Sequence, residues 1–223
     1  MIHYNYSPHQ LEEKALELLK QFDSERLTKT KPLDVYAVIE KCLDVPYDWK
    51  YLTPNQSILG MTAFKAGTLW VWPESYYEEG MLPTKIYVKE GTILIDGSLT
   101  ELPERGAENF TVMHEVFHQV LHTRCFRHSN PDYTHCTTRD ALKNGKRQSM
   151  TPLEICEYQA NTCAAAFLMP KPLLIEKVNR YAGGRLHLKS YADYLLVKNL
   201  AEEFSVSPTA MKFRLLNLGL ADQ

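Results

Sequence analysis

The segment HEVFH, residues 114 to 118, places two histidines four residues apart, with a glutamate directly after the first. On a helix this spacing puts both side chains on one face, one turn apart, so the imidazoles of His114 and His118 can bind one tetrahedral metal ion. Glu115 then lies beside the ion, where a carboxylate can accept a proton from a water whose pKa the ion lowers toward about 7. The pattern predicts a zinc site for hydrolysis, with Glu115 as the catalytic base.

The residues around these histidines have the periodicity of a helix packed on a core. Apolar side chains recur at a spacing of four in two adjoining stripes, Val112, Val116 and Val120 beside Met113, Phe117 and Leu121. His122 continues the histidine stripe, but it lies about 12 Å from His114 along the helix axis, too far for both to bind one ion. We exclude His122 as a ligand. It is either a polar group beside the metal ligands or a histidine satisfied at the helix end.

A catalytic zinc site needs a third protein ligand, and the helical segment from Glu157 to Pro170 offers the next candidates. A helix here has a face of small residues, which lets another helix approach closely; they are Ala160, Cys163 and Ala164. Glu157 stands at the start of the segment and Glu154 one turn earlier. Either carboxylate can be the third ligand, or a solvated first-turn group stabilised by the helix dipole. Asn161 is expected either to hydrogen-bond a ligand histidine and fix its tautomer or to be a surface residue.

Helices at both ends of the chain must position these groups. Ser7-Pro8-His9-Gln10 has the form of a capping box before an amphipathic helix, and a second helix is expected to begin at Pro32. From Tyr47 to Asp96 short runs rich in β-branched and aromatic residues, broken by glycines such as Gly60, predict a small antiparallel sheet. Helical periodicity returns beyond Pro103. The chain is therefore expected to be α+β.

Composition excludes some classes of function. The chain has 223 residues, with 25 Lys+Arg against 27 Asp+Glu, so it has no general electrostatic attraction for nucleic acid or anionic membranes. No apolar run is long enough to cross a bilayer, and the N-terminal residues lack the pattern of a signal peptide. We expect a cytoplasmic protein whose five scattered cysteines are reduced thiols.

Five segments of the chain together resemble the ImmA/IrrE metallo-endopeptidases. They are KPLDVYAVIEKCLDVPYD, ILIDGSL, NFTVMHEVFHQVLH, EYQANTCAAAFLMP and LAEEFSVSPTAMKFRLLNLGL. The resemblance covers most of the chain and implies a zincin-like fold that binds one zinc ion. It selects Glu157 over Glu154 as the third ligand, and it assigns the catalytic base to Glu115. The chain departs from the family pattern at Cys163, a change within the core, and at Phe117, where we expect different packing beside the site.

The family resemblance also implies a substrate, a helix-turn-helix transcriptional repressor cleaved at a specific bond. The alternative is a regulatory protein that binds a transcription factor around a zinc ion without hydrolysis. In either case we expect a zincin-like domain over residues 1–180 and a helical C-terminal appendage over residues 181–223, packed on the same domain. The sequence of this appendage predicts a helix, a turn and a second helix. In the second helix only Lys212 and Arg214 carry a positive charge that could bind DNA phosphates. We do not expect direct DNA binding.

The polar stretch from Thr123 to Met150 carries four further residues that could bind a metal, Cys125, His128, His135 and Cys136. Their spacing matches no strong zinc-ribbon pattern. We expect a loop beside the cleft that helps to select substrate.

Overall fold

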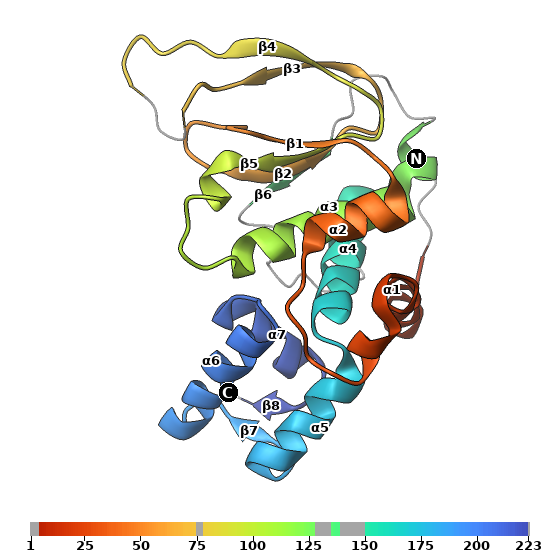
Figure 1. Cartoon of the computed structure of the whole chain (residues 1–223), viewed down its shortest axis with the longest axis vertical. Helices are drawn as coiled ribbons and strands as arrows, with labels where there is room; N and C mark the ends of the chain where they lie inside the picture. The colour runs from red at the N-terminus through yellow and green to blue at the C-terminus, as the bar shows by residue number, and fades with distance from the viewer. Residues whose placement is uncertain (1–4, 75–77, 128–134, 139–149, 223) are drawn as a thin grey trace.

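A four-stranded sheet lies between a long helix, α3, and a β-hairpin at one end of the molecule (Figure 1). The computed structural model describes residues 5–74, 78–127, 135–138 and 150–222. The strand order is β1-β5-β2-β6. These strands are β1 (Tyr47–Lys50), β2 (Ile58–Thr62), β5 (Ile93–Asp96) and β6 (His135–Thr138). β2 pairs antiparallel with β5 and β6, whereas β1 pairs parallel with β5, so the sheet is mixed rather than wholly antiparallel.

The hairpin of β3 (Gly67–Val71) and β4 (Thr84–Val88) covers the face of the sheet opposite to α3. All four residues of β5 are buried, because both of its faces are covered. Ile93 and Ile95 belong to the main core, which includes α3, while Leu94 packs in a second cluster with residues of the hairpin. This alternation follows from the two-residue period of a strand.

Most of the remaining described residues are helical, and together with the sheet the helices confirm the predicted α+β class. The longer ones are α1 (Pro8–Asp23), α3 (Gly106–Arg127), α4 (Pro152–Leu168), α5 (Lys171–Ala182), α6 (Tyr191–Glu203) and α7 (Pro208–Asn217). The short helical turns are η1 (Ser24–Leu27), α2 (Val35–Val38), η2 (Ile39–Leu43) and η3 (Gly97–Leu99). Strand β6 was not predicted, and neither were two parallel two-residue strands, β7 (Leu186–His187) and β8 (Ala221–Asp222).

Local sequence signals fix where the helices begin. The capping box predicted at Ser7 is present, with Gln10 as its partner, and α4 begins with a second box formed by Thr151 and Glu154. The second helix begins at Val35 rather than Pro32, because the side chain of Asp34 accepts hydrogen bonds from the first turn.

Helix α4 lies between α1 and α3, so the small residues that predicted the approach of one helix face two. Ala160, Cys163 and Ala164 are fully buried, and the thiol of Cys163 donates to the backbone carbonyl of Leu11 in α1 at 3.3 Å. Small side chains let the helix axes approach on both sides. α4 is therefore held between two helices, and its position relative to α3 is fixed by packing.

The turn between α6 and α7 packs on the beginning of α3. A Cβ at Gly106 would lie 2.5 Å from the backbone nitrogen of Ser207, so only glycine permits this approach. The amide of Asn109 donates to the carbonyl of Ser205 at 2.9 Å. The beginning of the helix that carries both histidines is therefore held by the C-terminal segment.

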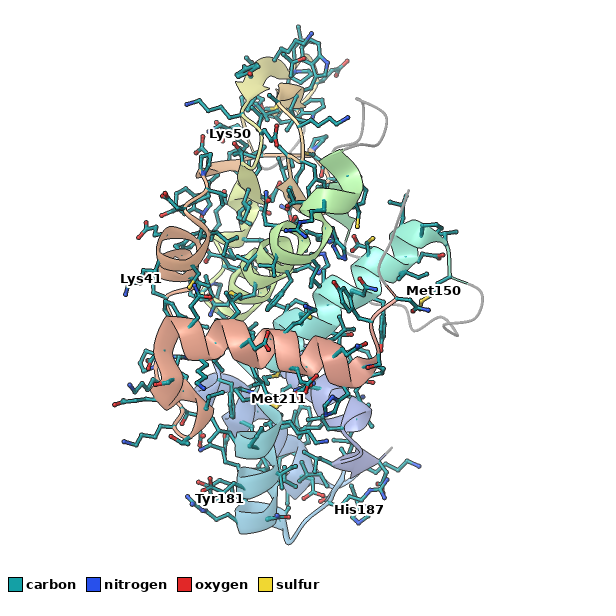
Figure 2. All side chains as sticks on the ribbon, turned by 90° about the vertical axis from the view of Figure 1, so that its right-hand side faces the viewer. Lys41, Lys50, Met150, Tyr181, His187 and Met211 are labelled. Atoms are coloured by element: carbon teal, nitrogen blue, oxygen red, sulfur yellow. The ribbon has the colours of Figure 1, made fainter. Side chains whose placement is uncertain are left out.

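Helix α7 is joined to α1 and α4 through Arg214. This side chain is 5% exposed, pairs with Glu12 and donates to the carbonyl of Met169. Met211, also in α7, lies in the main core where α1 meets the C-terminal helices (Figure 2). The C-terminal segment thus shares a core with the rest of the chain, while the proposed division near residue 180 stays a prediction.

The structure also bears on the expectations about the cysteines and about membrane spans. Cys42, Cys156 and Cys163 are reduced thiols, as expected. Among the described residues, no helix combines the length and apolar character that a membrane span requires.

Candidate metal centre

Helix α3 brings the two histidines of the HEVFH segment together in the core. His114 and His118 are both fully buried, and their ring centroids lie 4.6 Å apart. Their Nε2 atoms are 2.8 Å apart, so both rings direct the same nitrogen at one point. This is the arrangement that the four-residue spacing predicted.

Helix α4 adds the carboxylate of Glu157 to this pair. Oε2 of Glu157 lies 3.3 Å from Nε2 of His114, and Oε1 lies 3.2 Å from Nε2 of His118. Donor atoms held about 2 Å from one ion at tetrahedral angles are about 3.3 Å apart. The separations between Glu157 and the two histidines match this value, and two imidazoles with one carboxylate form a donor set suited to zinc. His114, His118 and Glu157 therefore fit a single divalent ion.

Glu154, the alternative third ligand, has another role. Its carboxylate accepts a hydrogen bond of 2.7 Å from the backbone nitrogen of Thr151 and closes the capping box of α4. This backbone hydrogen bond, together with the Thr151 hydroxyl, lowers the pKa of Glu154. Glu154 therefore caps the N-terminus of α4, whereas Glu157 faces the histidines.

Asn161 supports His114 from one turn beyond Glu157. Its Oδ1 lies 2.9 Å from Nδ1 of His114. An amide oxygen only accepts, so Nδ1 carries the proton and Nε2 presents its lone pair to the metal position. Burial lowers the pKa of His114, while the hydrogen bond and charge of Glu157, the charge of Glu115 and the Asn161 hydrogen bond raise it, and the net shift is upward. Of the two roles left open for Asn161, the structure gives it the one beside the ligand.

His122 contacts the other ligand rather than the metal position. Its Nδ1 lies 3.0 Å from Nδ1 of His118, and its Nε2 lies 3.0 Å from Oε1 of Gln159 in α4. Both His122 and Gln159 are buried. Gln159 was not predicted. The signal that could have found it is a polar residue placed among the buried small residues of α4.

Glu115 points toward the sheet, where β2 supports it. The hydroxyl of Thr62 donates to Oε2 of Glu115 at 2.6 Å. A Cβ on Gly60 would lie 2.8 Å from Oε1, so the strand comes close enough to touch the carboxylate only because residue 60 is glycine. The charge of Glu115 also raises the pKa of His114, the residue that precedes it in the helix.

The remaining candidates of the polar stretch lie mostly outside the described residues. α3 continues to Arg127, so Cys125 is a buried helical residue that packs with Phe64, Phe126 and Cys156. Residues 128–134 and 139–149 are outside the described residues, as are the side chains of His135 and Cys136 in β6. Where the stretch is described, the expected loop is wrong, because residues 123–127 continue α3 and residues 135–138 form β6, which pairs with β2. A role of this stretch in selecting substrate stays a prediction.

Comparison with known families agrees with this geometry. The sequence model of the Peptidase_M78 family, described as the IrrE N-terminal-like domain, matches residues 92–216. The match spans more than half of the chain, and it includes His114, Glu115, His118 and Glu157. No curated protein sequence matches the chain. The match confirms the resemblance read from the sequence: the chain belongs to the IrrE N-terminal-like family of M78 peptidases, and its centre is that of a metallopeptidase-like protein.

Proposed function

We propose that the protein is a zinc-dependent endopeptidase that hydrolyses a peptide bond of a protein substrate. The observation that carries this proposal is the convergence of His114 Nε2, His118 Nε2 and a carboxylate oxygen of Glu157, all within 4.8 Å of one another, beside a buried glutamate. Among the described residues this group offers three ligands, and three protein ligands with a fourth position for water or substrate are typical of catalytic zinc sites. A closed structural site would need a fourth protein ligand.

Each residue of the centre has a separate role in the proposed hydrolysis. When bound, the ion supplies a Lewis acid that polarises the scissile carbonyl and lowers the pKa of the attacking water. Glu115 accepts the proton of that water and later delivers it to the nitrogen of the leaving amine. Thr62 donates to Oε2 of Glu115 and so fixes the orientation of the carboxylate. Asn161 keeps Nε2 of His114 unprotonated.

The proposed substrate is a helix-turn-helix repressor in the cytoplasm. Support for it is the resemblance of five segments, from the N-terminal KPLDVYAVIEKCLDVPYD to the C-terminal LAEEFSVSPTAMKFRLLNLGL, to the ImmA/IrrE peptidases. Recognition is proposed to occur between proteins rather than through DNA, because Arg214 is buried in its contact with Glu12.

The test is the Glu115→Gln variant, incubated with zinc and with helix-turn-helix repressors sought among the products of the neighbouring genes. Glutamine keeps the shape of the side chain but cannot accept the proton, so we expect cleavage to fall by at least about 10²-fold at unchanged zinc content. Cleavage is measured by mass spectrometry of the fragments, and zinc by elemental analysis. Glu176→Gln, an exposed glutamate of α5 paired with Arg180, is the matched control and should cleave normally.

Two outcomes would contradict the proposal. If Glu115→Gln cleaves as well as the unaltered protein, Glu115 is not the base. If the unaltered protein binds zinc and the repressor without cutting it, the chain is a regulatory binding protein.

A further inference from the structure

A chain of three buried side chains leads from α4 to one of the metal ligands. Oε1 of Gln159 lies 3.0 Å from Nε2 of His122, and Nδ1 of His122 lies 3.0 Å from Nδ1 of His118. His118 then turns its Nε2 toward His114 and Glu157. Gln159 and His118 are fully buried, and His122 is 2% exposed. One amide thus reaches a metal ligand through an intervening imidazole.

The direction of the protons along this chain decides whether His118 can bind a metal. A neutral imidazole carries one N–H, so its two nitrogens are one donor and one acceptor. If Gln159 accepts at Oε1, His122 carries its proton on Nε2 and accepts at Nδ1. His118 must then donate from Nδ1, which leaves a lone pair on Nε2 for the metal.

The reverse direction blocks the site. If the amide nitrogen of Gln159 donated to His122, the proton of His122 would lie on Nδ1, and His118 would have to accept there. His118 would then carry its proton on Nε2, at the position of the ion. A doubly protonated His122 would have the same effect. Only one direction therefore agrees with metal binding.

We propose that Gln159 is a positioning residue that acts through His122 to hold His118 in the tautomer with Nδ1 protonated and Nε2 available to the metal. The inference rests on the proposed metal site and adds to it the residues that prepare the second histidine. Partners that hold the ligands of a metal typically change its affinity by about 10- to 100-fold when they are removed. His114 receives the same support directly from Asn161, and His118 receives it through a relay.

Two phenylalanine rings beside His118 and His122 strengthen the preference for one tautomer. The ring of Phe64 lies edge-on to His118 and that of Phe126 edge-on to His122, both at 6.4 Å between centroids, and the two phenylalanines stack on each other. In such apolar surroundings two N–H groups that face each other raise the free energy of the folded state, because little water is present to accept their hydrogen bonds. The setting therefore favours one complete direction of the hydrogen bonds over a mixed one.

The test compares two substitutions of Gln159 with opposite properties. Gln159→Met keeps the volume of the side chain but removes the acceptor, whereas Gln159→Glu keeps an acceptor and places a charge in the core. We expect Gln159→Met to raise the Kd for zinc by roughly 10- to 100-fold, measured by competition with a chromogenic chelator, and Gln159→Glu to bind close to normally. A packing role would give the opposite order, with Met tolerated and Glu harmful, and that result would overturn the inference.

A double-mutant cycle tests whether Gln159 acts through His122. In the His122→Phe background, Gln159→Met should change the Kd for zinc no further, because the relay is already broken. A further loss of about tenfold or more in that background would mean that Gln159 acts independently of His122, and the relay would be wrong.

Long-range ¹H–¹⁵N spectra of the zinc-loaded, unaltered protein test the same point without any substitution. His122 should be protonated at Nε2 and unprotonated at Nδ1, and the opposite tautomer overturns the inference even if a variant fails to fold. If the unaltered protein binds no zinc, the proposed function fails together with this inference. If it binds zinc and Gln159→Met binds it equally well, only the inference fails.

Discussion

The metal ligands and the proposed base are held by different parts of the molecule. On one side of α3, the neighbouring helix α4 supplies Glu157 and the amides that support the two histidines. On the other side, strand β2 holds Glu115 through the hydroxyl of Thr62 and the close approach of Gly60. α4 contributes a ligand and hydrogen-bond acceptors, and β2 contributes a donor. Metal binding and proton transfer should therefore be separable by mutation.

The largest effect is expected on the α4 side. Glu157→Ala removes one of three ligands, so the Kd for zinc should rise by more than the roughly 10- to 100-fold typical of residues that only support ligands. Cleavage should disappear with the metal. Dialysis against zinc followed by elemental analysis measures the bound ion.

Glu154→Ala is the matched control for this substitution. It removes a carboxylate from the same helix one turn earlier, where the side chain caps α4 rather than facing the histidines. It should weaken the capping box of α4 and leave the zinc content unchanged. Loss of zinc in Glu154→Ala with retention in Glu157→Ala would reverse the assignment of the third ligand.

The β2 side should give a smaller effect of a different kind. Thr62→Val keeps the shape of the side chain but removes the hydrogen bond to Oε2 of Glu115. A hydrogen bond to a charged group contributes about 1.5–3 kcal/mol, so we expect kcat to fall by about 10- to 100-fold while the Kd for zinc does not change. Steady-state cleavage and the chelator assay on the same preparation measure both quantities.

Thr123→Val controls for the loss of a hydroxyl on the metal helix itself. Thr123 donates to the backbone carbonyl of Gln119 and should be replaced without effect on kcat. If Thr62→Val released zinc, the two sides of the centre would not be independent, and the comparison between α4 and β2 would fail.

Local signals in the sequence predicted much of the α4 side of the centre, although not Gln159. The spacing of His114 and His118 follows from the helical period, and the start of α4 follows from the cap at Thr151, which sets Glu157 one turn into the helix. Asn161, one turn later, then faces the same way. Choosing Glu157 over Glu154 still required the resemblance to a family, because both carboxylates fit the period.

The β2 side could not be predicted in this way. Thr62 and Glu115 are 53 residues apart, and nothing in the periodicity of either segment links them. Gly60 was taken as a break between strands, whereas it lies within β2, where the absence of a side chain admits Glu115. The parallel pairing of β1 with β5 likewise depends on long-range contacts. Phe117 is buried in the core against Phe167, as its place in the apolar stripe of the helix predicted.

The smallest expected effect concerns the face of α4 that turns away from the ligands. Burial, and after it the charge of Glu12, raises the pKa of the Cys163 thiol to about 12, well above its usual range. The unfolded chain loses this proton near pH 8.5, so the stability that the buried thiol contributes is complete below that pH and is lost as the pH rises toward 12.

At pH 8 the folded protein should therefore protect Cys163 from a thiol reagent. Native Cys163→Ala and unaltered protein should bind equal amounts of the reagent, and after unfolding they should differ by one thiol. A difference in the native state would mean that α4 separates from α1 without unfolding, and the rigid placement of Glu157 and Gln159 would then need another cause.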